Sequence, residues 1–251
     1  MSKIVFKKIT TFILIINLFI LSCSSSDDLQ NNNLDSVIML EFGTSLVFQD
    51  SGKLNEQKDA IKTVVKETVS LVNKKMDVEN LKIRINVSLS NVIPEIGIGG
   101  FNPSEQEITI SIDPNFTNLE QSISIELAPM IVHEMHHAKR RRTIGYGSTL
   151  LEASVSEGLA DCFAMEIKGI EPPLWSIALT GSELDGWIVT AQDSWRDGSY
   201  DHGKWFFGTS SDVPRWTGYS IGFKLVKDYI TENPTKKPSE LFNESANSFV
   251  K

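Results

Sequence analysis

The feature that most constrains the fold is a pair of histidines in the sequence His133-Glu134-Met135-His136-His137. In a helix, a spacing of four residues places His133 and His137 about 40° apart around the axis and one turn apart along it, so both imidazoles can reach one metal ion. Apolar residues and Pro129 precede the motif, and a basic run follows it at residues 139–142. This polarity is typical of a helix, so the sequence predicts a helix that carries both histidines.

A second predicted helix supplies acidic groups, the first of which, Glu157, lies twenty residues after His137. Glu157 and Asp161 are one helical turn apart, Thr149 and Glu152 form a T-x-x-E capping box before them, and Gly169 follows as a C-cap. In this predicted helix, Glu157 can serve as a third, oxygen ligand. Asp161 can accept a hydrogen bond from the ring nitrogen of a ligand histidine that does not face the metal.

Two residues beside these motifs carry further expectations. Gly158 lies inside the second predicted helix, where glycine is about 1 kcal/mol less favourable than alanine, so we expect close packing of Gly158 against the histidine-bearing helix. His136 could pair with His133, but that pair would take Glu134 away from its usual relation to the attacking water. We therefore interpret His136 as a neighbour of the site or as a residue of the helix surface.

The combination of these motifs resembles a known enzyme class. HExxH followed by E-x-x-x-D at this separation resembles the gluzincin branch of zinc metallopeptidases. The local sequences HEMHH and SEGLAD resemble those of a bacterial family of predicted zinc-dependent proteases. The resemblance is strong over residues 124–169. It implies that His133, His137 and Glu157 bind Zn²⁺ and leave a fourth position for water, as in catalytic rather than structural zinc sites.

The activity that the resemblance implies is hydrolysis of peptide bonds in proteins or peptides. Glu134 would act as the general base, taking a proton from the attacking water and delivering it to the leaving amine. The oxyanion needs a further donor, for which Tyr219 and His202 are the first candidates and Tyr200 and Arg215 the next. We favour Tyr219 because it lies at the start of a predicted helix between two glycines, from where it could project into a cleft.

The N-terminal residues resemble a bacterial lipoprotein signal peptide. Residues 1–22 combine three lysines with an apolar run that is too short to span a bilayer, and they end in a lipobox-like Ile20-Leu21-Ser22-Cys23. We expect lipidation of Cys23 to anchor the protein to a membrane of the bacterial cell envelope, at the periplasmic face or at the cell surface. Residues 23–35 would form a flexible tether and residues 36–251 the metallopeptidase domain.

Charge and cysteine content narrow the possible partners. Removal of residues 1–22 takes away three lysines and no acidic residue, so the net charge changes from −8 to −11. An acidic chain with a basic cluster only at one helix end argues against nucleic-acid binding. Cys162 would then be the one remaining thiol, which we expect to be a small buried hydrophobe. The expected partners are a protein or peptide substrate and the membrane.

A different class of function is also compatible with the sequence. The protein could be a non-catalytic envelope lipoprotein that binds a partner and uses its metal only to hold helices together. The presence of Glu134 favours the enzyme, because structural coordination does not need a carboxylate at that position.

Periodicity gives the remaining elements. A helical stripe runs through residues 54–75, and strict alternation predicts half-buried strands at residues 82–90 and 107–113. By resemblance to gluzincins, residues 97–101 are a candidate for the strand that pairs with an extended substrate, and a mobile hairpin loop is the alternative. Further helices are predicted at residues 182–196, 218–230 and 238–250.

Strands early and helices late predict an α+β fold. We expect a small, mostly antiparallel N-terminal sheet with helices, then a helical C-terminal part, with a zincin-like cleft between them.

Overall fold

The computed structural model describes residues 37–250, so the predicted signal peptide and tether at residues 1–35 lie outside the described residues. No helix within residues 37–250 is long and apolar enough to cross a membrane. The elements in chain order are β1 (Val37–Met39), η1 (Glu41–Gly43), β2 (Ser45–Gln49), α1 (Lys58–Asn73), β3 (Lys82–Val87), β4 (Ile98–Ser104), β5 (Glu107–Ile112), α2 (Leu119–Ile125), α3 (Leu127–Arg141), α4 (Leu150–Lys168), α5 (Gly181–Gln192), η2 (Gly203–Phe207), α6 (Thr217–Glu232), η3 (Pro238–Glu240) and η4 (Ala246–Phe249).

The strands of the described residues form one mixed sheet in the order β1-β2-β3-β5-β4. β2, β3 and β5 are parallel neighbours, whereas β1 pairs with β2 and β4 pairs with β5 in antiparallel fashion. The α+β prediction is confirmed, but the expectation of a mostly antiparallel sheet was wrong. The alternation of side chains is the same in both kinds of sheet, and the α1 crossover that makes β2 and β3 parallel leaves no mark on the strand pattern.

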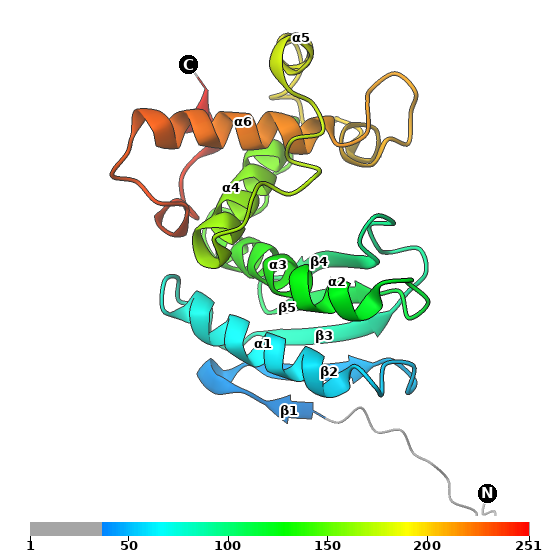
Figure 1. The fold of residues 1–251 in the computed structure, drawn as a ribbon. Coiled ribbons are helices and arrows are strands. Elements are labelled where there is room, and N and C mark those ends of the chain that lie inside the picture. The colour runs from blue at the N-terminus through cyan, green and yellow to red at the C-terminus, as the bar shows by residue number, and fades with distance from the viewer. Residues whose placement is uncertain (1–36, 251) are drawn as a thin grey trace, which may run out of the picture. The chain divides into compact units, whose positions relative to one another are not determined.

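One face of this sheet is covered by α1, α2 and α3 (Figure 1). The isoleucines of β3 and β5 point toward these helices and are fully buried, while Arg84 and Asn86, which alternate with them, remain partly exposed. α1 contributes its apolar stripe to the same core, and α3 lies against both α1 and the strands β4 and β5. Because α3 lies against strands on one side, its position relative to the sheet is fixed by apolar packing.

β4 is an edge strand of the sheet, so residues 98–101 are part of a strand and not of a mobile hairpin loop. Gly97 adopts a left-handed conformation (φ 67°) directly before it, and a Cβ at this position would collide with the ring of Phe116. The side chain of Phe101 is 63% exposed. At the start of β4, the carbonyl oxygen of Ile98 already accepts from the N–H of Ile93. Edge strands can pair with extended peptides, and this role of β4 stays a prediction.

The C-terminal half is helical and has its own apolar core. α4 packs on α3 on one side and on α6 on the other, and α5, η2, η4 and the chain end complete this second core (Figure 1). Cys162 belongs to it and is 4% exposed, which confirms the expectation of a buried thiol. Burial raises the pKa of Cys162, so the thiol stays protonated.

Gly158 has a different neighbour from the one expected. A Cβ on Gly158 would lie 2.2 Å from the carbonyl oxygen of Gly222, and a Cβ on Gly222 would lie 1.7 Å from the carbonyl oxygen of Ser154. Gly158 therefore allows close approach of α6 to α4, and the expectation that it faces α3 was wrong. Helical periodicity places a residue on a face but does not say which element covers that face.

The predicted helix at residues 238–250 was also wrong, because two short 3-10 turns, η3 and η4, occupy this stretch. Asn243, Ser245 and Asn247 interrupt it, and such side chains compete with helical hydrogen bonds; Ser245 caps η4 by accepting from the backbone N–H of Asn247. The other predicted helices and strands are present with shifted ends, as α1, β3, β5, α5 and α6.

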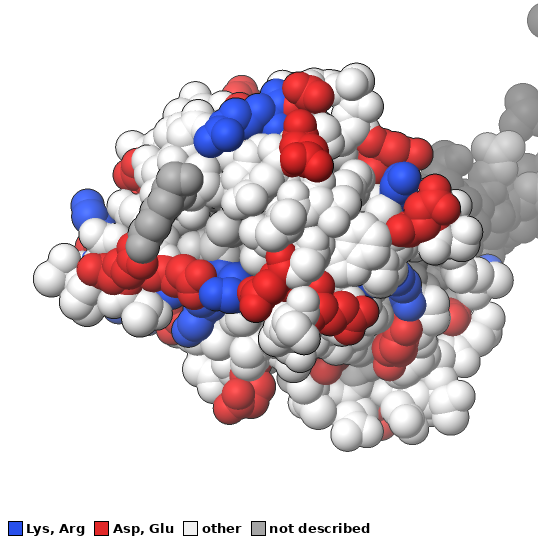
Figure 2. All heavy atoms as spheres, turned by 90° about the horizontal axis from the view of Figure 1, so that it is seen from above, with Lys and Arg blue, Asp and Glu red and all other residues white. Residues whose placement is uncertain are grey.

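Charged residues are mixed on the face of the molecule seen from above α6 (Figure 2). Lys and Arg side chains occur there in separate small groups with Asp and Glu side chains between them. This face therefore presents no continuous basic band. Ion pairs among the described residues include Lys224 with Asp228 at 2.6 Å and Arg215 with Glu95 at 2.7 Å.

Candidate metal centre

α3 holds the two histidines of the HExxH motif inside the molecule. The helix lies between the sheet and α4, and all its residues from Leu127 to Ala138 are buried. His133 is 6% exposed and His137 is 4% exposed, which is unusual for polar side chains without partners. Both ring nitrogens of His133 have partners, whereas Nδ1 of His137 has none among the described residues.

α4 brings the acidic residues to these histidines. Its start is fixed by the predicted capping box, in which Thr149 Oγ1 accepts from the N–H of Glu152 and Glu152 Oε2 accepts from the N–H of Thr149. Its end is fixed by Gly169 in the left-handed conformation (φ 62°). Two turns after the cap, Glu157 faces α3 and is 5% exposed.

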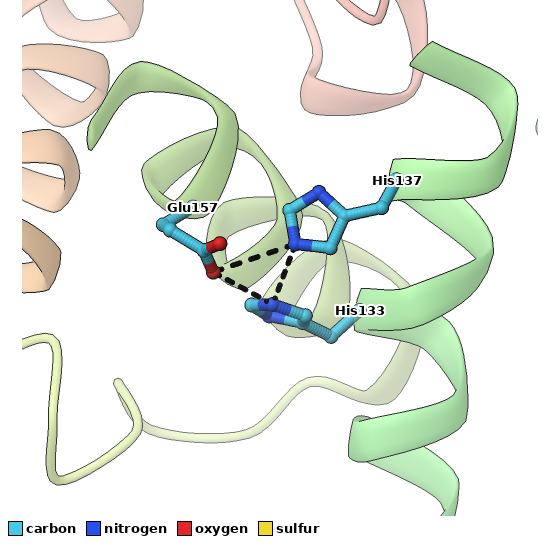
Figure 3. Close-up of side chains that lie close together, drawn as sticks. All are labelled: His133, His137 and Glu157. Atoms are coloured by element: carbon cyan, nitrogen blue, oxygen red, sulfur yellow. Dashed lines mark hydrogen bonds and ion pairs between the residues drawn. The ribbon is translucent and has the colours of Figure 1, made fainter. Parts of the chain in front are cut away.

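The three predicted ligands come together from these two helices (Figure 3). His133 Nε2 lies 2.9 Å from His137 Nε2 and 3.0 Å from Glu157 Oε2. His137 Nε2 lies 3.4 Å from Glu157 Oε2. Tetrahedral zinc with nitrogen and oxygen ligands at about 2.0–2.2 Å places neighbouring ligand atoms about 3.3 Å apart, so these separations fit a zinc ion.

The hydrogen bond between His133 and Asp161 supports this fit. His133 Nδ1 donates to Asp161 Oδ1 at 2.7 Å, as the spacing of Glu157 and Asp161 predicted. In the neutral ring, this leaves Nε2 with a lone pair that points at the other two ligand atoms. Three electron-pair donors at such distances repel each other unless a cation or a proton lies between them.

The pKa values of His133 and Glu157 are shifted by burial in one direction and by their charged neighbours in the other. Burial lowers the pKa of His133, but Asp161 and then Glu157 outweigh it and hold that pKa well above its ordinary value. Burial raises the pKa of Glu157, but His137 and His133 outweigh it and hold that pKa well below its ordinary value. His133 and Glu157 thus each stabilise the charged form of the other, and a metal ion that binds these atoms has to compete with a proton.

Glu134 lies beside the ligands and is 4% exposed. Burial raises its pKa, the two ligand histidines lower it, and Glu157 and Asp161 raise it further, with a raised value as the result. The edge strand passes close by, because a Cβ on Gly100 would lie 2.3 Å from Glu134 Oε1. Glycine at position 100 thus leaves space for the carboxylate next to a strand that could hold substrate.

A cleft of about 950 Å³ opens onto His133 and Glu134. Its walls come from α3, from the edge strand β4, from the region around the start of α6 and from the sheet itself. The sheet residues that line it are Gln49, Arg84, Asn86, Glu107, Thr109 and Ser111. The lining includes Gly99, Gly100, Phe101, Met130, Trp175, Phe207, Arg215, Trp216 and Tyr219. The part of this cleft that borders β4, His133 and Glu134 is open to a ligand.

Tyr219 is placed in this cleft, whereas His202 is held elsewhere. Burial raises the pKa of Tyr219 well above its ordinary value, with further contributions from Glu157, Asp161 and Glu134, so its hydroxyl keeps its proton. The ring of His202 stacks on Phe206 at 4.3 Å, and its Nδ1 is hydrogen-bonded to Tyr200 at 2.9 Å. Tyr219 thus lines the cleft and His202 does not, and the role of Tyr219 as the oxyanion donor stays a prediction.

The site contains contacts that the sequence did not indicate. The hydroxyl of Tyr146 donates to Glu157 Oε1 at 2.6 Å. Trp175 Nε1 donates to both oxygens of Asp161 at 3.1 Å, and Ser176 Oγ donates to Asp161 Oδ2. These residues lie in connecting segments without periodicity, and the only local signal is that Tyr146 stands between two glycines.

His136 occupies a different environment from the one expected. It is fully buried, so the interpretation as a helix-surface residue was wrong. Its ring lies 5.5 Å from that of Phe163, and neither ring nitrogen has a hydrogen-bond partner among the described residues. Burial lowers the pKa of His136 well below its ordinary value, so it is a neutral ring in the core and not a support for the ligands.

Fold and site together define an α+β protein with a candidate HExxH metal centre of two histidines and one glutamate. Residues 61–251 match the model of a family described as predicted Zn-dependent protease, DUF2268, which covers about three quarters of the chain. The chain belongs to this family. Comparison with curated proteins and with solved structures gives no match.

Proposed function

We propose that this protein is a zinc-dependent peptidase of the bacterial cell envelope, in which His133, His137 and Glu157 hold the metal. The observation that carries this proposal is the convergence of three ligand atoms from α3 and α4 directly beside Glu134 and the cleft. The family description, predicted Zn-dependent protease, supports the same activity. Zinc, when bound, supplies Lewis acidity, which makes a water molecule a stronger acid and polarises a carbonyl oxygen.

The protein's own residues perform the proton transfers. Glu134 is the general base that accepts the proton of the attacking water and then donates it to the leaving amine. Its raised pKa suits both steps, because the carboxylate must bind the proton long enough to hand it on. Tyr219 donates its hydroxyl proton in a hydrogen bond to the carbonyl oxygen as negative charge develops there.

The cleft determines how the substrate is held. β4 is an edge strand, and its backbone can pair with an extended peptide that lies along the cleft. Gly100 keeps the strand close to Glu134, so a peptide bond paired to β4 lies within reach of the base. Protein or peptide chains in extended conformation are therefore the substrate class.

Location in the envelope rests on the sequence of residues 1–23. The positive start, the short apolar run and the lipobox-like ending support a lipid anchor on Cys23. Fractionation of cells that express the wild type or Cys23→Ser tests this. We expect the wild type in the membrane fraction and the variant outside it, and equal distribution of both would contradict the anchor.

Glu134→Gln tests the activity most directly. We expect this variant to lose turnover of a peptide library by at least about 100-fold, because general base catalysis contributes about 10² to 10⁴ in rate, while it retains about one zinc per chain. Glu120→Gln, which changes an exposed glutamate of α2, is the matched control and should behave as the wild type. Loss of zinc in Glu134→Gln, or full activity in it, would contradict the assigned role.

The ligand assignment has its own measurement. His137→Ala and Glu157→Ala should each lose the zinc that mass spectrometry detects in the wild type. If the wild-type protein binds no zinc after purification and zinc addition, the peptidase proposal fails.

A further inference from the structure

We propose that Tyr146 is a positioning residue that fixes Glu157 as a ligand with one oxygen. This inference rests on the proposed metal site, but it concerns a residue to which neither the motif nor the family description assigns a role. The two carboxylate oxygens of Glu157 have separate partners. Oε1 accepts the hydrogen bond from the Tyr146 hydroxyl at 2.6 Å, and Oε2 faces His133 and His137 at 3.0 and 3.4 Å.

A hydrogen bond from a hydroxyl to a carboxylate is short and about twice as strong as one between neutral groups. With Oε1 engaged in this way, the carboxylate cannot rotate without losing the bond. Oε2 then stays directed at the two histidine nitrogens, which is the arrangement that a four-coordinate zinc site needs. Tyr146 thus restricts the side chain of Glu157 before the metal binds, so that less conformational freedom is lost on binding.

The ring of Tyr146 is itself held in place. It contacts the ring of His137 edge-on, with centroids 5.3 Å apart, and the guanidinium group of Arg141 lies 5.7 Å from its centroid. His137 and Tyr146 therefore support each other on one side of the metal position. A phenylalanine at position 146 would keep these ring contacts and lose only the hydroxyl.

The backbone of Tyr146 is tied to buried groups of α3 and α4. Arg140 Nε donates to Ser156 Oγ at 2.9 Å, and Ser156 Oγ donates to the carbonyl oxygen of Tyr146 at 2.7 Å. Arg140 is 2% exposed and also donates to the carbonyl oxygens of Phe242 and Glu244. This chain of hydrogen bonds anchors the loop between α3 and α4 at the residue that contacts Glu157.

The glycines on either side of Tyr146 allow this loop path. Gly145 has φ 86° and Gly147 has φ 106°, values in the left-handed region that side chains disfavour. A Cβ on Gly147 would also lie 2.2 Å from Cβ of Glu152, the residue of the capping box. The sequence Gly145-Tyr146-Gly147 thus lets the loop turn twice and present one aromatic hydroxyl to the metal site.

This role differs from that of Tyr219. The hydroxyl proton of Tyr146 is already donated to Glu157, so it is not available to a substrate carbonyl. Tyr146 therefore acts on the metal site, whereas Tyr219 lines the cleft and acts on the substrate. Substitution of Tyr146 should therefore change zinc affinity, whereas substitution of Tyr219 should change turnover.

Tyr146→Phe in the full-length chain, purified in detergent, tests the proposal. Competition with a chromophoric zinc chelator should show a zinc dissociation constant about 10- to 100-fold higher than that of the wild type, the range found for residues that support metal ligands. At saturating zinc, the kcat of Tyr146→Phe should lie within a few-fold of the wild-type value. Tyr229→Phe, which removes a hydroxyl from a ring packed on Phe249, should leave the zinc affinity unchanged.

Two outcomes would overturn the proposal. One is a wild-type zinc affinity in Tyr146→Phe. The other is a kcat loss greater than about 100-fold at saturating zinc without a change in zinc affinity, which would make Tyr146 a catalytic group like an oxyanion donor. Circular dichroism of the zinc-free variant controls for folding. Because zinc affinity is measured without substrate, the result stands even if no peptide is cleaved.

Discussion

Asp161 controls the geometry of the site without being one of the three predicted ligands. Its carboxylate is fully buried and accepts hydrogen bonds from His133 Nδ1, Trp175 Nε1 and Ser176 Oγ. Three donors offset the loss of hydration of a buried charge. The same arrangement orients the ring of His133 and leaves its Nε2 for a metal, so the segment after α4 contributes to the metal site through Asp161.

Tyr219→Phe is the residue-scale prediction. Loss of one donor to a developing oxyanion lowers kcat about 100- to 1000-fold, and we expect that loss here with little change in KM and none in zinc content. Steady-state kinetics on one cleaved peptide, with metal analysis of the same sample, measures both. Tyr229→Phe is the control. A wild-type kcat in Tyr219→Phe would move the role to another residue, and His202→Ala would then be examined in the same assay.

At this scale, the convergence of the three candidate metal ligands could be predicted from the sequence, whereas the residues that hydrogen-bond to them from the loops could not. The helical period alone places His133, His137 and Glu157 on facing sides of two helices, provided that the helices are neighbours. The contact of Tyr146 with Glu157 depends instead on two left-handed glycines and on a hydrogen-bond chain from Arg140. Such loop geometry has no periodic signal.

α4 is the element on which the site depends most, because it contacts α3 on one side and α6 on the other. The contact with α6 is made at backbone level by Gly158 and Gly222. The sequence indicated the capping box and the C-cap of this helix correctly, since these are local interactions. The sequence did not indicate which helix packs on Gly158, or that β2 and β3 are parallel. Both features depend on contacts between elements that are distant in the sequence.

Gly222→Ala is the prediction for this element. The new Cβ would lie 1.7 Å from the carbonyl oxygen of Ser154, so α6 must move away from α4, and overpacking of this kind lowers the free energy of unfolding by about 1–3 kcal/mol. Urea denaturation measures the change.

Gly186→Ala is the matched control for Gly222→Ala. Gly186 lies within α5, is exposed, and has no atom within 4 Å of the position of a Cβ, so alanine should raise helix stability by up to about 1 kcal/mol. Equal effects of the two substitutions would show that the α4 and α6 backbones do not approach as described.

The described residues form two apolar cores, and the candidate metal site lies between them. The apolar residues of α3, which carries His133 and His137, belong to the core under the sheet, whereas Val155 and Leu159, which flank Glu157 in α4, belong to the helical core. A metal ion bound by all three residues would therefore link the two cores. This arrangement gives metal binding a consequence for stability as well as for chemistry.

Removal of zinc tests the molecule as a whole and separates the two functions that the sequence left open. Binding to the folded state alone stabilises a protein by about 4 kcal/mol at a ligand concentration 1000 times its Kd, so a chelator should lower the melting temperature, and zinc should restore it. Glu157→Ala should melt at the same temperature with and without zinc.

If the metal were only structural, Glu134→Gln would match the wild type in every property. For the peptidase, we expect Glu134→Gln to keep the full zinc-dependent rise in melting temperature while turnover is lost. That combination requires a metal that both joins the cores and works with Glu134, and its absence would favour the non-catalytic binding protein.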